Sequence, residues 1–172
     1  MDDQQFDVII VGAGFGGIGA AIQLKSLGYE NVLIVDREDD LGGTWHVNHY
    51  PGLAVDQPSP TFSYRFEPNP YWSRMYAPGA ELKSYAVNVA EKYDVRRFMR
   101  FNTTVEGARW DEDARLWRLA LADGETLSLD LWQPRASSPR LLPRLEPLGV
   151  ERSTGHCAAM AAEAASRAVS IS

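Results

Sequence analysis

A glycine-rich segment from Gly12 to Gly17 is the feature that most constrains the fold of this chain. Its glycines at positions 12, 14 and 17 fit the pattern G-x-G-x-x-G, and the segment lies between two different periodicities. Before it, Phe6 to Val11 is a near-continuous β-branched run. After it come a helix-like stretch, Ile18 to Leu27, and a second apolar run, Val32 to Val35. This order predicts a βαβ unit with two buried parallel strands and a right-handed crossover.

Each glycine of the pattern has a physical role in that setting. Gly12 permits a tight turn, Gly14 lets the backbone approach a pyrophosphate, and Gly17 lets helix and strand pack closely. The unpaired N–H groups and the positive dipole of the helix N-terminus would then hold phosphates without a cationic side chain. Asp36 follows the second apolar run, at the spacing where an acid accepts hydrogen bonds from the ribose hydroxyls of an adenosine.

Arg37 leaves two interpretations of the ribose open. Its guanidinium could hold a 2′-phosphate, but the adjacent Asp36 carboxylate would repel one, so an unphosphorylated ribose, as in FAD or NAD, is favoured. The structural alternative is a glycine-rich turn that binds nothing, beside an exposed Asp36. The agreement of strand, glycines, helix, strand and acid argues against that alternative.

Beyond the βαβ unit, the pattern changes three times. Leu41 to Pro78 is rich in Pro, Gly, Tyr and Trp and predicts a long ordered excursion. Apolar residues at helical spacing predict one amphipathic helix over Glu81 to Tyr93. Val105 to Trp110, Leu116 to Ala122 and Thr126 to Leu131 predict a small antiparallel β-meander. The expected fold class is therefore α/β, a Rossmann-like but incomplete βαβ unit followed by a meander.

Composition divides the chain near residue 131. Seventeen of its 18 aromatic residues lie before residue 132, and residues 132–172 are rich in Ala, Arg, Ser and Pro. A segment without large apolar side chains cannot easily offset the entropy of ordering. We expect residues 1–131 to form the N-terminal part of a Rossmann domain that binds FAD or NAD(P), and residues 132–172 to be a poorly ordered tail.

Composition and motifs also exclude several classes of protein. The net charge of −6 argues against a nucleic acid or an anionic membrane as partner. Cys157 is the single cysteine, which excludes a disulfide framework within one chain and favours a reducing, cytoplasmic location. The apolar run from Val8 to Ile22 is interrupted by glycines and is no membrane span. His46 and His49 form H-x-x-H without further ligands nearby, so no metal site is predicted.

Three further motifs follow along the chain. They are G-G-T-W at positions 42–45, Y-P-G at positions 50–52 and Asp56. With them, roughly residues 6–131 resemble the FAD-dependent, NADPH-using class B flavoprotein monooxygenases. The resemblance is greatest to their Baeyer–Villiger branch, which includes cyclohexanone and phenylacetone monooxygenases. It implies an oxidoreductase that uses O₂ to insert one oxygen atom beside a ketone carbonyl, giving an ester or a lactone.

The resemblance implies that eleven residues lie along a bound FAD. These are Gly12, Gly14, Phe15, Gly17, Asp36, Gly43, Thr44, Trp45, Asp56, Phe62 and Val105. By the family pattern, the first glycine loop lines the pyrophosphate, Asp36 holds the adenosine ribose, and the backbone at Val105 meets the adenine. No catalytic residue is assigned within the chain.

The remaining positions would lie toward the flavin. Gly43, Thr44 and Trp45 would run beside the pyrophosphate and flavin, and Asp56 would lie near the isoalloxazine ring and the nicotinamide. At Phe62 many relatives have tyrosine, so the hydrogen bond of a phenol is lost here. The residues alone leave open that Trp45 only packs beneath the long excursion.

The family pattern ends near Leu131. The expected Ala-Thr-Gly strand, the second glycine motif for NADPH and the catalytic Arg have no matching residues, and Pro134 and Pro139 exclude a central strand. We therefore expect a truncated or frame-shifted product with an exposed sheet edge that favours aggregation. Three functions remain open: an FAD-binding part of such a monooxygenase, a non-catalytic nucleotide-binding remnant or pseudogene product, and an NAD-dependent oxidoreductase.

Overall fold

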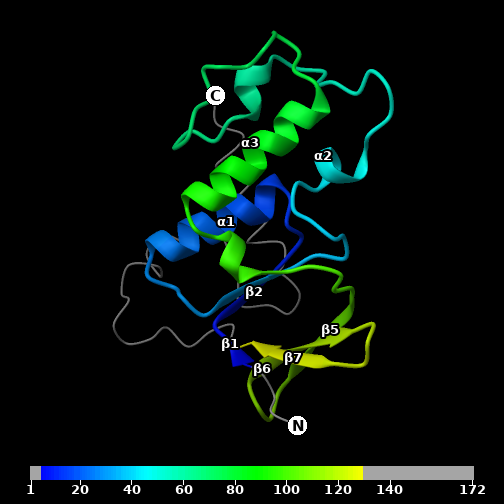
Figure 1. The fold of residues 1–172 in the computed structure, drawn as a ribbon. Helices are drawn as coiled ribbons and strands as arrows, with labels where there is room; N and C mark the ends of the chain where they lie inside the picture. The colour runs from blue at the N-terminus through cyan, green and yellow to red at the C-terminus, as the bar shows by residue number, and fades with distance from the viewer. Residues whose placement is uncertain (1–4, 130–172) are drawn as a thin grey trace.

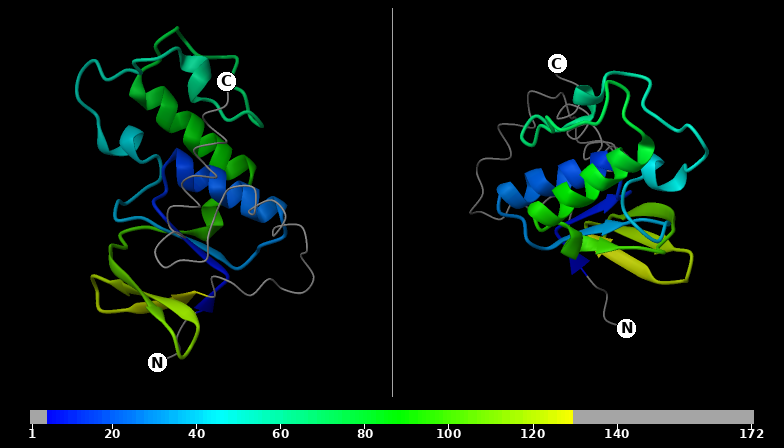
Figure 2. Two further views of the ribbon diagram at one scale, coloured as in Figure 1. Left: turned by 180° about the vertical axis from the view of Figure 1, so that it is seen from behind. Right: turned by 45° about the horizontal axis from the view of Figure 1, so that its top comes forward.

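The computed structural model describes residues 5–129, and the tail predicted over residues 132–172 lies outside them. Two helices, α1 (Phe15–Ser26) and α3 (Gly79–Lys92), lie side by side over one face of a small parallel sheet. A second, mostly antiparallel sheet packs against the other face, so the described residues form three layers (Figures 1 and 2). The α/β class with a Rossmann-like βαβ unit is thereby confirmed.

The parallel sheet has the order β2-β3-β4. It consists of β2 (Val8–Val11), β3 (Val32–Val35) and β4 (Met99–Arg100). Successive side chains of β3 point to opposite layers: Ile34 packs with the helices, whereas Leu33 packs toward the second sheet. Because both faces are covered, all four residues of β3 are buried, as its continuous apolar run predicts.

The predicted meander is confirmed, with a shift of one residue at the end of each of its first two strands; the predicted end of the third strand, at Leu131, lies outside the described residues. Its strands are β5 (Val105–Asp111), β6 (Leu116–Leu121) and β7 (Thr126–Leu129), paired antiparallel in that order. Gly124, with φ of +86°, closes the tight turn between the last two strands. The inner face of the meander presents leucines to the parallel sheet.

The prediction of a single strand over Phe6–Val11 was wrong in one respect, because the chain changes sheets at Asp7. Before it, β1 (Gln5–Phe6) pairs in parallel with β7, so that Gln5 lies opposite Ser128. The Asp7 N–H donates to the Asn31 carbonyl at 3.0 Å, and the Asn31 amide donates to the Gln5 carbonyl at 3.1 Å. Both sheets bury apolar side chains, so apolar residues lie on both sides of Asp7 and the sequence reads as one strand.

Helix α1 begins three residues earlier than Ile18, because the glycines before it already adopt helical geometry. Its end follows from Gly28, which has φ of +91°. The Gly28 N–H donates to Lys25 O at 2.9 Å and the Tyr29 N–H donates to Leu24 O at 3.1 Å. This pair of hydrogen bonds is a Schellman motif, in which a glycine terminates the helix and satisfies its last carbonyls.

Helix α3 confirms the predicted amphipathic helix, although it begins at Gly79 and ends at Lys92. The face toward the core carries its buried apolar residues, which are Leu82, Tyr85, Ala86, Val89 and Ala90. No helix within the described part of the chain is long and apolar enough to cross a membrane.

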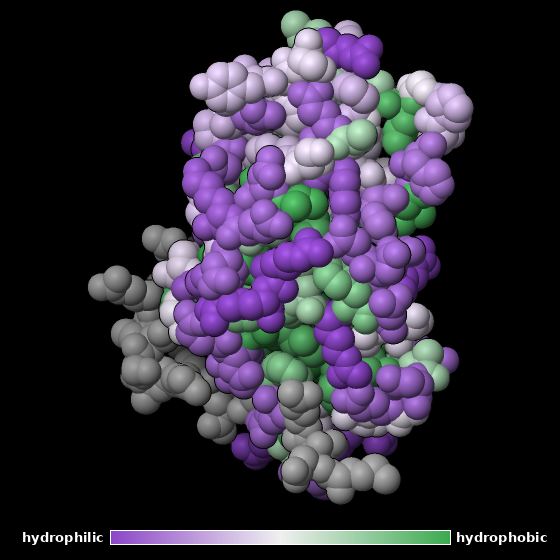
Figure 3. Space-filling model, viewed as in Figure 1, coloured by the Kyte–Doolittle hydropathy of each residue, from purple (hydrophilic) through white to green (hydrophobic). Residues whose placement is uncertain are grey.

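The excursion from Leu41 to Pro78 is ordered by local hydrogen bonds and contains two short helical turns. These are α2 (Thr44–Val47) and the 3-10 turn η1 (Ser59–Phe62). Ser59 is fully buried, and its hydroxyl accepts the Ala77 N–H at 2.8 Å. On the face seen in Figure 3, hydrophobic residues are visible between hydrophilic ones in the middle of the molecule.

Candidate functional site

The first glycine turn depends on the absence of side chains at two positions. Gly12 has φ of +104°, which side-chain-bearing residues rarely adopt, and its N–H donates to Val35 O at 2.8 Å. A Cβ atom on Gly17 would lie 1.9 Å from the Gly12 carbonyl oxygen. Because Gly17 has no side chain, the backbone of α1 packs closely against β2 and the turn that follows it. This close packing is the role that the motif predicts for this glycine.

A second glycine turn, Gly42 and Gly43, packs directly against the first. The Gly42 N–H donates to the Ala13 carbonyl at 2.8 Å. Gly43 has φ of +55°, and a Cβ atom on it would lie 3.0 Å from Gly14 Cα. The two turns thus meet backbone to backbone, and no side chain separates them.

The N-terminus of α1 lies at this junction of the two glycine turns. Its N-cap is Gly14, no side chain caps it, and no acidic residue occupies its first turn. The first N–H groups of a helix have no partner within the helix, and the dipole places positive potential there. A helix of 12 residues that starts in this way is suited to binding an anion through backbone N–H groups.

Asp36 lies at the same junction, and its carboxylate is bonded to the glycine turn. Oδ2 accepts the Ala13 N–H at 2.6 Å, and Oδ1 accepts the Glu38 N–H at 3.0 Å. Arg37 is exposed, and its Nε donates to Glu38 Oε1 at 3.0 Å. The Thr103 N–H donates to the Asp36 carbonyl at 2.8 Å, which brings the stretch before β5 alongside.

Three predicted aromatic residues, Phe15, Trp45 and Phe62, pack on one small buried cluster. The Trp45 ring meets the edge of Phe62 with centroids 5.8 Å apart. The Phe15 ring stacks on Tyr64 at 5.7 Å and on Tyr85 at 5.8 Å. Phe15 therefore contributes its backbone to the helix N-terminus, while its side chain points into the aromatic core.

Three other predicted residues are placed less closely. Thr44 is exposed at the first position of α2, and Asp56 is exposed directly after the buried Val55. Val105 is half-buried at the first position of β5, opposite Leu121. Their contacts with a cofactor remain predictions.

Tyr64 is a residue of the site that the motifs did not identify. It is fully buried, and its hydroxyl donates to the carbonyl of Phe15. Its ring also lies against α1, since a Cβ atom on Gly19 would be 3.0 Å from Tyr64 Cε1. Burial raises the pKa of Tyr64, and burial also raises the pKa of Tyr85 to about 12. Both phenols are therefore protonated donors at neutral pH. In the sequence, the aromatic density of the excursion was the signal for a residue such as Tyr64.

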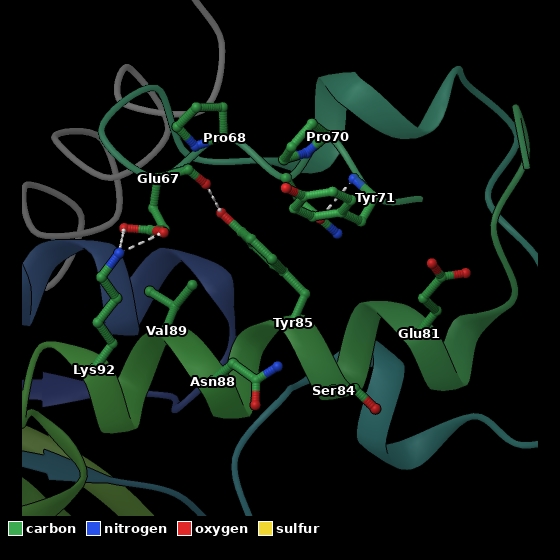
Figure 4. Close-up of a pocket in the computed structure, with 11 residues that line it drawn as sticks. Glu67, Pro68, Pro70, Tyr71, Glu81, Ser84, Tyr85, Asn88, Val89 and Lys92 are labelled. Atoms are coloured by element: carbon green, nitrogen blue, oxygen red, sulfur yellow. Dashed lines mark hydrogen bonds and ion pairs between the residues drawn. The ribbon is translucent and has the colours of Figure 1, made fainter. Parts of the chain in front are cut away.

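A cleft of about 280 Å³ lies on another side of α3, between this helix and residues 67–71 (Figure 4). There Lys92 points to Glu67 and their charged atoms are 2.7 Å apart, while the Tyr85 hydroxyl donates to the Glu67 carbonyl at 2.7 Å. None of the eleven predicted residues lines this cleft. In the described residues, no group of three or more His, Cys, Asp or Glu side chains could hold a metal ion.

A charged cluster lies just before the second glycine turn. The Asp40 carboxylate is 2.7 Å from Lys83 Nζ and 2.9 Å from Arg96 Nη2. Burial raises the pKa of Asp40, but hydrogen bonds from Lys83 and the Leu41 backbone and the charges of Lys83 and Arg96 outweigh it. Together they lower the pKa from 3.8 to about 2.

This lowered pKa predicts a pH-dependent contribution to stability. A carboxyl group with a lowered folded-state pKa stabilises the fold fully above its unfolded-state pKa and loses that contribution as pH falls through the folded-state value. We expect Asp40→Asn to cost on the order of 1–2 kcal/mol of unfolding free energy at pH 6. The difference from the unchanged protein should shrink between about pH 4 and pH 2. Urea unfolding across this range measures it; a difference independent of pH would contradict the assignment.

Comparison with known proteins identifies a family model and several monooxygenases that are similar to this chain. Residues 10–78 match the model of the NAD(P)-binding Rossmann-like domain. A Baeyer-Villiger monooxygenase of Pseudomonas aeruginosa is 42% identical over 117 residues, which are 68% of this chain and 22% of that protein. The FAD-binding monooxygenase tazF of Aspergillus terreus is 38% identical over 117 residues, 66% of this chain and 21% of that protein.

The fold agrees with the sequence match. The solved structure of an oxidized steroid monooxygenase bound to NADP superposes with a TM-score of 0.68 at 34% identity. The superposition covers 73% of this chain and 25% of that structure. The chain thus spans about a quarter of the length of the proteins that it matches.

Proposed function

We infer that this chain belongs, over its N-terminal part, to the Baeyer–Villiger monooxygenase family. From that premise we propose that residues 5–129 bind the adenosine diphosphate portion of FAD. One observation carries the proposal. The two glycine turns meet at an N-terminus of α1 that no side chain caps, with the Asp36 carboxylate bonded to the same turn.

The chemistry of these residues fits the ligand. A pyrophosphate needs N–H donors and close access to backbone, and the junction of Gly14 with Gly43 supplies a surface without Cβ atoms. Each oxygen of Asp36 accepts one backbone N–H and keeps a further lone pair for a ribose hydroxyl. Arg37 is paired with Glu38, and this acidic neighbourhood disfavours a 2′-phosphate.

The aromatic residues suit the flavin end of the same cofactor. Trp45 and Phe62 would flank it at the mouth of the buried cluster, with Asp56 and Thr44 on the adjoining exposed segments, and the Val105 backbone would meet the adenine. When bound, FAD would supply the redox chemistry with which the family oxidises ketones. The described residues would bind and orient it and exclude water from its aromatic side.

The complete reaction goes beyond these residues. We propose that it is the family's NADPH-dependent insertion of oxygen from O₂ into a ketone, giving an ester or a lactone, in a cytoplasmic protein. The chain spans about a quarter of the length of its relatives, and we propose that the NADPH and ketone sites lie outside the matched residues.

Titration with FAD, followed by the change in flavin fluorescence, tests the binding proposal. We expect FAD to bind, ADP to compete, and 2′-phosphorylated ADP to compete about tenfold less well. Asp36→Asn should weaken FAD binding about tenfold, because a carboxylate accepts ribose hydrogen bonds more strongly than an amide does. The exposed Asp39→Asn is the matched control. Tighter binding of NAD than of FAD would instead favour the NAD-dependent oxidoreductase.

A further inference from the structure

The second glycine turn is held by a residue from a different part of the chain. Lys83, in the first half of α3, lies 42 residues after Leu41 and donates from Nζ to the Leu41 carbonyl. The same Nζ lies 2.7 Å from Asp40 Oδ2. One ammonium group therefore bonds two successive residues at the entry to the turn.

The stem of Lys83 contacts the third residue in this series. A Cβ atom on Gly42 would lie 2.8 Å from Lys83 Cδ, so the methylene chain packs against the glycine backbone. Gly42 has φ of +116° and donates its N–H to Ala13 of the first turn. Lys83 thus touches residues 40, 41 and 42 in succession, and Gly43 follows them directly.

This contact differs from an ordinary surface ion pair. The side chains of Lys83 and Asp40 are 20% and 30% exposed, whereas the Lys92 side chain, which pairs with Glu67 on the same helix, is 62% exposed. Exposed pairs contribute little, but a half-buried ammonium with several acceptors holds a fixed geometry. Arg96 bonds the second oxygen of Asp40 at 2.9 Å and so fixes the carboxylate from the other side.

We propose that Lys83 is a positioning residue for the nucleotide site. It holds the Gly42–Gly43 turn against Gly14, and it thereby sets the width of the backbone surface that receives the pyrophosphate. Lys83 itself does not touch the ligand in this role. The inference rests on the proposed binding of FAD and adds the residue that sets the affinity of that site.

The decisive variant is Lys83→Met, which keeps an unbranched apolar stem and removes the ammonium group. We expect it to weaken FAD binding about tenfold, which is the effect of losing one charge-assisted hydrogen bond that positions the site. Lys92→Met, on the same helix and ion-paired at 2.7 Å, is the matched control and should change FAD affinity less than twofold. Each affinity is measured by flavin fluorescence on the full chain, with urea unfolding of the ligand-free protein alongside.

A purely structural role makes a different prediction. Val89→Ala removes a buried contact of α3 that is remote in sequence from the turn, so it should lower stability while FAD affinity stays unchanged. If Lys83→Met loses affinity only in proportion to a loss of stability, as a general weakening of α3 would require, the positioning role is wrong. Should Lys83→Met fail to fold, Asp40→Asn disrupts the same contact and is expected to weaken FAD binding in the same direction.

The outcomes also separate the two proposals. If the unchanged protein binds no FAD, the proposed function fails and the positioning role fails with it. If the unchanged protein binds FAD while Lys83→Met and Lys92→Met both bind it equally well, the proposed function stands and only the role of Lys83 is overturned. Selective loss in Lys83→Met supports both.

Discussion

Replacing Gly17 by alanine is expected to abolish the proposed nucleotide binding and to cost about 3 kcal/mol or more of unfolding free energy. The added Cβ atom would lie 1.9 Å from the Gly12 carbonyl oxygen. The position of a Cβ atom is fixed by the backbone of α1, and the carbonyl oxygen belongs to the backbone of the turn, so no side-chain rotation relieves the clash. Helix α1 would have to move away from the turn, which separates the N–H groups of the helix from the position of the pyrophosphate.

Gly107→Ala provides the matched control for this substitution. Gly107 lies in β5, and a Cβ atom there meets nothing within 4 Å. It should therefore change stability by less than about 0.5 kcal/mol. Urea unfolding and FAD titration of the two variants measure the contrast. Unchanged stability and affinity in Gly17→Ala would show that the turn is more open than the structure describes.

Removal of the Tyr64 side chain should have the second large effect. Tyr64→Ala empties a fully buried aromatic site and is expected to cost about 3–5 kcal/mol. The ring stacks on Phe15 and on Phe66, with centroids 4.9 Å apart for Phe66, and it lies tilted against Tyr85 at 6.0 Å. Its loss would therefore loosen the segment on which α1 begins.

Tyr64→Phe separates packing from hydrogen bonding at this position. It keeps the ring but leaves the Phe15 carbonyl without its hydroxyl donor, at an expected cost of about 1–3 kcal/mol. Tyr71, whose side chain is 87% exposed, is the control, and Tyr71→Phe should be neutral. Thermal and urea unfolding compare the three variants. Equal stability of Tyr64→Phe and the unchanged protein would exclude a structural role for this hydrogen bond.

The sequence predicted those parts of the fold that depend on local pattern. The strands of the βαβ unit are continuous apolar runs around a glycine motif, and helix α3 and the meander repeat a period within a few residues, so each can be recognised from local sequence. The two-residue β4 was not predicted, because two residues carry no period and only pairing with β3 defines the strand. The sheet change at Asp7 was missed for a similar reason, since both sheets bury apolar side chains and the contact with Asn31 is not local.

The candidate site divides in the same way. Gly12, Gly17 and Asp36 were predicted from motif spacing, because each has a role within one βαβ unit. Tyr64 and Lys83 were not predicted. Their contacts with Phe15 and Leu41 span 49 and 42 residues, and no short motif records a contact across such distances. The residues proposed to bind the ligand can thus be found by motif, whereas the residues proposed to hold the glycine turns in place require the structure.

The pairing of β1 with β7 has a consequence for folding during synthesis. Gln5 leaves the ribosome well before its partner Ser128, which follows it by 123 residues (128 − 5). At translation rates of about 5–20 residues per second, β1 waits roughly 6 to 25 s for its partner. The βαβ unit can form within that interval, but the edge that β7 will occupy stays open. Early exposure of this edge to chaperones or to other nascent chains is therefore built into the topology.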